Sequence, residues 1–193
     1  SIDESDWEID FTINQGDIAN VIGGLGMRQN ASEGFDIYDG FSMPNFSEFL
    51  DLNHKKKLNQ YNYSKDVIPT TDSYTWNFKV DASNTESPAR INWNNSYMGV
   101  NDINLILFDE QSNIWIDMKQ HSYYSFTPPA NFKVLYGSAN YVEKEIGNGD
   151  VKILEVSPNP ASGPISIHVF LPEWQKKFPL QLELKSITGI TLA

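Results

Sequence analysis

The chain has 193 residues, a net charge of −11 and no cysteine, and its longest strongly apolar run, residues 103–108, is far too short to span a bilayer. Its length fits one mid-sized domain, or one domain followed by a short second module. The excess of 25 acidic over 14 basic residues argues against nucleic-acid binding, and the lack of cysteine excludes disulfides, thiolate metal sites and a cysteine nucleophile.

Apolar residues recur with a period of two along most of the sequence. This pattern is typical of strands with one buried and one solvent-facing side, and β-branched and aromatic residues dominate it. Turn-forming clusters of Asn, Gly, Ser, Asp and Pro separate the segments. Only residues 46–57 approach a helical pattern, of one or two turns. The expected strands, in chain order, lie at 7–13, 74–80, 91–93, 103–108, 114–116, 132–136, 165–169 and 180–184.

These patterns predict an all-β chain. We expect an antiparallel β-sandwich of immunoglobulin-like or jelly-roll-like topology, with about eight strands, followed by a partial second β-sandwich module. A charge change marks the boundary, because residues 1–150 carry −12 and residues 151–193 carry +1. We therefore expect domains at 1–147 and 151–193, joined by a linker at 148–150. The expected core of the first domain contains Trp7, Phe11, Trp76, Phe78, Trp93, Leu105 and Leu107.

No motif of a catalytic site is found in the sequence. The histidines lack metal-ligand spacing and are interpreted as surface or structural residues; they are His54, His121 and His168. Gly23, Gly24 and Gly26 do not match a dinucleotide or phosphate loop, and no helical pattern follows them. We interpret these glycines as turn or bulge residues, and we predict that the chain is not an enzyme.

Two groups of residues are candidates for ligand binding. Trp115, Tyr123 and Tyr124 are candidates for a sugar-stacking surface, because one of two adjacent tyrosines in a strand must face outward. Asp36 and Asp39 offer loop carboxylates of the kind that Ca²⁺ prefers, and calcium is the cofactor that the sequence suggests. Each group also has a simpler interpretation. The aromatic residues could be isolated surface side chains, and the two aspartates could belong to a solvated acidic loop.

The C-terminal segment carries a short motif between apolar strands. Two prolines cannot donate ladder hydrogen bonds, so the segment that holds them is expected to form a rigid turn. The order of strand, Pro-Asn-Pro turn, strand and later Gly turn resembles the N-terminal half of the type IX secretion system C-terminal sorting domain. The resemblance covers residues 151–193, and its motif residues are Pro158, Asn159, Pro160, Gly163 and Gly189.

This resemblance implies an exported protein. Such a module is recognised by an outer-membrane translocon and by a sortase-like processing enzyme, which places the protein outside a Gram-negative bacterium or on its surface. Residues 33–44 and the strands at 74–80 and 89–93 are similar to a β-sandwich seen just ahead of such sorting tails. The implied function is non-catalytic export and cell-surface attachment, with the sandwich as spacer or adhesion module. The alternative is a carbohydrate-binding module of a polysaccharide-degrading enzyme, with glycans as ligands.

The C-terminal strands also need a covering layer. Residues 165–171 and 180–187 each present one apolar face, and two or three strands alone are only marginally stable in water. We expect this face to pack onto the upstream sandwich, because the short linker keeps the two parts at high local concentration.

Overall fold

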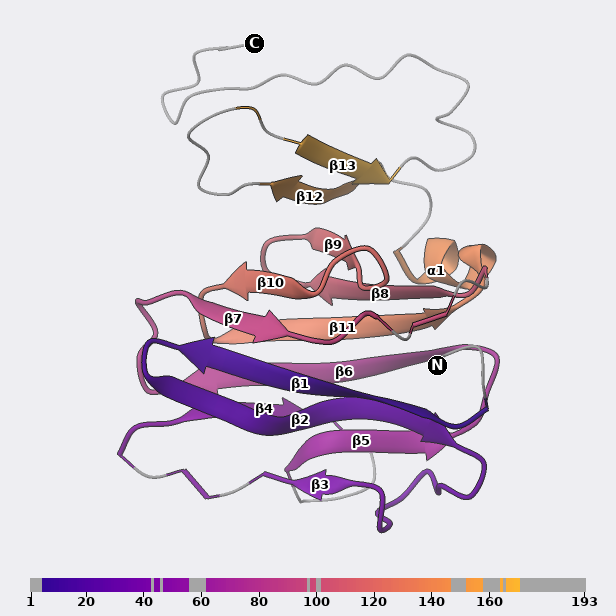
Figure 1. Cartoon of the computed structure of the whole chain (residues 1–193), viewed down its shortest axis with the longest axis horizontal. Helices are drawn as coiled ribbons and strands as arrows, with labels where there is room; N and C mark the ends of the chain where they lie inside the picture. The colour runs from indigo at the N-terminus through magenta and orange to yellow at the C-terminus, as the bar shows by residue number, and fades with distance from the viewer. Residues whose placement is uncertain are drawn as a thin grey trace.

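The computed structural model of the chain describes residues 5–42, 44–45, 47–55, 62–96, 98–99, 102–146, 152–157, 164 and 166–170. These residues form two β-sheets and one helix (Figure 1), which confirms the predicted all-β class. In chain order the elements are β1 (Trp7–Gln15), β2 (Ile18–Arg28), β3 (Gly40–Phe41), β4 (Leu50–His54), β5 (Tyr63–Pro69), β6 (Tyr74–Ala82), β7 (Ala89–Asn92), β8 (Asn104–Asp109), β9 (Ile114–Asp117), β10 (Tyr123–Phe126), β11 (Ala130–Gly137), α1 (Ala139–Ile146), β12 (Lys152–Ser157) and β13 (Ser166–Phe170).

The large sheet is a single mixed sheet folded on itself into a sandwich. Its strand order is β10-β7-β1-β2-β5-β4-β6-β11-β8-β9, and β3 pairs with β5. Among the described strands every pairing is antiparallel except that of β2 with β5, so the expectation of a purely antiparallel sandwich needs this correction. The sheet bends between β5 and β4, which share the single residue pair Tyr63–His54. The described part of the large sheet has 11 strands rather than about eight.

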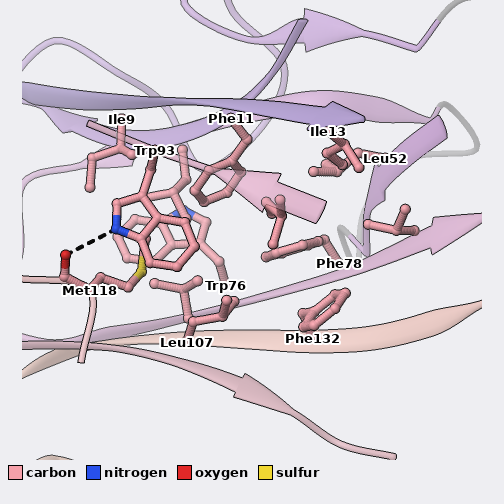
Figure 2. Packing of buried hydrophobic residues seen from close by; sticks show 14 of the residues in the cluster. Ile9, Phe11, Ile13, Leu52, Trp76, Phe78, Trp93, Leu107, Met118 and Phe132 are labelled. Atoms are coloured by element: carbon pink, nitrogen blue, oxygen red, sulfur yellow. Dashed lines mark hydrogen bonds between the residues drawn. The ribbon is translucent and has the colours of Figure 1, made fainter. Parts of the chain in front are cut away.

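The core lies between the two halves of this folded sheet. Phe11 of β1 approaches Phe78 of β6, with ring centroids 5.7 Å apart, and Phe78 in turn packs against Phe132 of β11 at 5.3 Å. Figure 2 shows Phe11 on one side of the core and Phe78 and Phe132 on the other. At its rim the Trp93 indole donates a hydrogen bond to the Met118 carbonyl, 3.0 Å away. All of the expected core residues are buried, which confirms that part of the prediction.

His54 helps to hold the bend in the sheet. Its ring is buried at the end of β4, and Nε2 lies 2.7 Å from the carbonyl oxygen of Gly24 in β2, to which it donates. This contact joins strands that lie on either side of the bend. His54 is therefore a structural histidine, as predicted.

The glycines of β2 allow close approach of β1. A Cβ atom at Gly24 would lie 2.6 Å from the Ile9 carbonyl oxygen, and one at Gly26 would lie still closer to that of Trp7. Both glycines belong to a continuous strand, so the interpretation as turn residues is wrong for them. A register shift in the β1–β2 pairing lies next to Gly23, where the alternative interpretation as a bulge applies.

A charge network crosses β2 above these glycines. The Lys65 side chain, from β5, passes Gly24 and reaches β1, where Nζ lies 2.5 Å from Glu8 Oε2 and 2.8 Å from Asp10 Oδ1. The other Glu8 oxygen accepts a hydrogen bond from Arg28 Nε at 2.5 Å. Because Gly24 has no side chain, Lys65 of β5 can cross β2 and form ion pairs with Glu8 and Asp10 of β1.

The network predicts a pH-dependent stability contribution from Glu8. Burial acts to raise the Glu8 pKa, but hydrogen bonds from Lys65 and Arg28 and their positive charges outweigh it, so the pKa lies below 4.5. We expect Glu8→Gln to lower the free energy of unfolding by about 1 kcal/mol near neutral pH. A carboxyl with a lowered folded-state pKa stabilises above its unfolded value and loses that effect as pH falls through the folded value.

The difference in the free energy of unfolding between wild type and Glu8→Gln should therefore disappear at pH values well below 4.5. Urea unfolding across this pH range measures it. Glu86→Gln, in an exposed loop, is the matched control and should show no such pH-dependent loss. Equal behaviour of the two variants would mean that the network does not stabilise the fold.

Helix α1 covers part of the outer face of the large sheet. Its Val142 packs into a small second cluster with Ile106 and Leu135, and the Ser138 hydroxyl accepts a hydrogen bond from the Tyr141 amide at 3.3 Å, as a helix N-cap does. Sequence analysis did not predict this helix, because eight residues present too few apolar positions for a helical period. The segment at 46–57, which approached a helical pattern, contains β4 instead.

The second sheet consists of β12 and β13, paired antiparallel from Lys152–Phe170 to Ser157–Ser166. β12 lies against β9 of the large sheet (Figure 1), whereas the expected packing of residues 165–171 and 180–187 onto the sandwich stays a prediction. The linker at 148–150 and the strand expected at 180–184 lie outside the described residues. No helix in the described part of the chain is long and apolar enough to cross a membrane.

Candidate functional site

The structure buries Trp115. Its side chain is 2% exposed and its ring stacks on Phe108 with the centroids 3.7 Å apart. Both rings belong to the small cluster that α1 covers. Trp115 therefore presents no open ring face to a sugar, and its place in the expected stacking surface is not supported.

Tyr123 and Tyr124 point to opposite sides of β10, as the alternation predicts. Tyr124 packs against the core, and its hydroxyl donates to Asp109 Oδ2 at 2.9 Å. Burial, followed by the negative charge of Asp109, raises the pKa of Tyr124 well above its usual value. Tyr123 is 50% exposed, and the Arg90 guanidinium lies 4.4 Å from its ring centroid. Of the expected stacking residues, only Tyr123 offers an open ring, and Arg90 already occupies one of its faces.

Asp36 and Asp39 organise their own loop. Asp36 accepts hydrogen bonds from the amides of Ser32 at 2.6 Å and Tyr38 at 2.8 Å. Asp39 accepts from the amides of Asp36 at 3.1 Å and Val67 at 3.0 Å, which ties the loop to β5. Among the described residues no three His, Asp or Glu side chains converge in an arrangement that could hold a metal ion. The structure thus gives these carboxylates a structural role in their own loop, and calcium binding by them stays a prediction.

This role predicts that Asp36→Ala destabilises the protein with or without calcium. Removing the carboxylate leaves two amides without their acceptor, which should cost about 1–2 kcal/mol. We expect the melting temperature of Asp36→Ala to fall below that of wild type. Millimolar calcium should change neither melting temperature. A rise with calcium that is seen only in wild type would instead support a calcium site at Asp36.

A cleft opens where β5 and β6 diverge. β4 lies between these two strands but ends at His54. Beyond that point, residues 65–69 of β5 pair with β2 and residues 74–77 of β6 pair with β11. In the described part of the sheet no strand joins the two edges that face each other. The resulting cleft has a volume of about 640 Å³, within the range of roughly 300–1,000 Å³ that is typical of small-molecule sites.

Most side chains that line the cleft are polar. Thr75 of β6 and Tyr141 of α1 form a hydroxyl pair at 2.8 Å, and the Asn77 amide donates to the Thr75 carbonyl at 3.3 Å. Lys55 lies after the end of β4, and its Nζ donates to Asn131 Oδ1 at 2.9 Å. Further hydroxyl groups in the lining are those of Thr70, Thr71 and Ser73.

Among the residues that the structure describes, the charged lining residues of the cleft are one cation and two anions. Lys55 is the cation, and Asp66 and Glu33 are the anions. Asp66 is a buried carboxylate of β5, whereas Glu33 is exposed on the loop that Asp36 organises. Apolar surface makes up slightly more than half of the lining, and Ile68, Pro69 and the tyrosine rings contribute to it. Such a mixed lining suits a ligand that has both polar groups and apolar faces.

Sequence analysis did not identify this cleft. Its residues come from four separate parts of the chain, which only the fold brings together. A local signal that could have found it is the density of hydroxyl side chains from Thr70 to Thr75, which exceeds what a turn requires.

The residues of the expected sorting motif lie outside the described part of the chain. This applies to Pro158, Asn159, Pro160, Gly163 and Gly189. The described strands β12 and β13 lie before and after the Pro-Asn-Pro segment in the sequence, and the resemblance stays a prediction. No protein-family model, no curated protein and no solved structure matches the chain.

Proposed function

We propose that this chain is a non-catalytic region of an exported protein, which serves export and cell-surface attachment through the type IX pathway. The observation that carries the proposal is the separate β12–β13 sheet, whose strands stand on either side of the Pro158-Asn159-Pro160 segment. On this proposal residues 151–193 are recognised by an outer-membrane translocon and by a sortase-like enzyme. The protein then resides outside a Gram-negative cell or on its outer membrane.

The sandwich would act as a spacer or adhesion module ahead of the sorting segment. β1, the first strand, is paired on both sides, with β2 and with β7, and its apolar side chains are buried in the aromatic core. A terminal strand held in this way resists being pulled out of the sheet. Such a module keeps upstream parts of a protein at a fixed distance from the attachment point.

Two deletions in the full-length gene product test the proposal. In a Gram-negative host with the type IX translocon, removing residues 151–193 should leave the protein inside the cell. Removing residues 7–146 should preserve its delivery to the surface. Fractionation and surface labelling measure both. Export without residues 151–193 would contradict the proposal.

A second candidate function is carbohydrate binding. The specific observation that favours it is the polar cleft between β5 and β6, not the surface at Tyr123. The two functions are compatible, because a module that is carried to the cell surface can also bind glycans there.

A further inference from the structure

We propose that the cleft between β5 and β6 binds a neutral, polyhydroxylated ligand, a sugar with one or two rings. This site is new relative to the aromatic surface expected from sequence. It gives the second candidate function a location and does not depend on export.

The cleft is held in shape by its own structure. Tyr74 stands edge-on against Trp76 of the core, with the ring centroids 4.9 Å apart. Tyr141 is fixed by its 2.8 Å contact with Thr75 and by its position on α1, which packs on the large sheet. A ligand would therefore meet preformed walls and lose little affinity to ordering them.

The charges of the cleft select against anions. The described lining residues include one lysine and two carboxylates, Asp66 and Glu33, and the chain as a whole carries −11. A phosphate or a carboxylate on a ligand would meet a net negative lining inside a negative protein. A neutral ligand avoids this repulsion.

The hydrogen-bonding groups match sugar hydroxyls. Each hydroxyl both donates and accepts, so it needs partners of both kinds close together. Asn77 and Lys55 supply donors, Asp66 supplies an acceptor, and the Thr75–Tyr141 pair can do either. The rings of Tyr74 and Tyr141 and the side chain of Pro69 offer apolar surface for the C–H face of a sugar. A ligand that has polar edges and apolar faces can form hydrogen bonds with the polar groups of the lining and pack against its apolar surface.

Calorimetric titration of the full chain tests the proposal. The neutral probes are glucose, galactose, mannose, xylose and cellobiose, and the matched anions are glucuronate and glucose 6-phosphate. We expect at least one neutral sugar to bind in the millimolar range or tighter. The anions should bind at least about tenfold more weakly than the best neutral sugar, because they meet like charge.

Variants locate the binding. Tyr141→Phe removes one hydroxyl and Asn77→Ala removes one amide, and each should weaken binding by roughly 3- to 10-fold. Tyr123→Ala, at the surface expected from sequence, is the control and should leave affinity unchanged. Melting curves verify that each variant is folded, and Tyr141→Phe is the conservative change if Asn77→Ala is unstable.

Three results would overturn the proposal. They are a wild type that binds none of the neutral sugars, a preference for the anions, and binding that Tyr123→Ala abolishes while the cleft variants retain it. None of these results bears on export, and a failed export assay leaves this titration unaffected. Each of the two proposals can therefore be contradicted without affecting the other.

Discussion

Replacing Phe78 with alanine should lower the free energy of unfolding by about 3–5 kcal/mol. Phe78 is fully buried in β6, with ring centroids 5.7 Å from Phe11 and 5.3 Å from Phe132. It also packs against His54, which closes the bend of the sheet. Truncation therefore leaves a cavity where the two halves of the sandwich meet. Urea unfolding followed by tryptophan fluorescence measures the loss.

Phe35→Ala is the matched control for this prediction. The Phe35 ring is 48% exposed on a loop and stacks on Phe41 outside the main core. Its removal should cost less than about 1 kcal/mol. Equal losses for the two variants would mean that Phe78 is not at the centre of the core.

Replacing Gly26 with alanine should lower the free energy of unfolding by about 2–3 kcal/mol. The new Cβ would overlap the Trp7 carbonyl oxygen and lie 2.8 Å from Glu8 Cγ. β1 and β2 would have to move apart, and Glu8 would be displaced from Lys65 and Arg28. Chemical denaturation measures the change in stability.

Gly34→Ala is the control for this second variant. The nearest atom to a Cβ at Gly34 is Ser32 Oγ, 3.9 Å away, which is an ordinary contact. We expect a change of less than about 1 kcal/mol in either direction. A Gly34→Ala loss as large as that of Gly26→Ala would show that close strand approach is not what selects glycine at position 26.

Alternation in the sequence predicts which side of a strand is buried, but not which strands pair. This is why the expected core residues, such as Trp76 and Leu107, are buried as predicted, whereas the parallel pairing of β2 with β5 was not anticipated. Alternation also cannot distinguish the main core from an outer face that another element covers. Trp115 was expected at an open surface for that reason, and α1, which covers the cluster that contains it, is too short to be recognised by its period.

The candidate site depends on long-range geometry. The cleft exists because β4 ends at His54 while β5 and β6 continue apart, and no local pattern records where a neighbouring strand ends. Asp36 and Asp39 were expected from the sequence as loop carboxylates that could bind calcium. Only the backbone amides placed around them show that they serve the loop itself.

The central claim is that the Pro-Asn-Pro segment directs export, and one localisation measurement tests it most directly. In the full-length gene product, Pro158, Asn159 and Pro160 are all changed to alanine. Pro44→Ala with Asn45→Ala, in an exposed loop of the sandwich, is the matched control. In a host with the type IX translocon, the account predicts that the first variant is retained inside the cell and the control reaches the surface. Surface delivery of the first variant at the wild-type level would contradict the account.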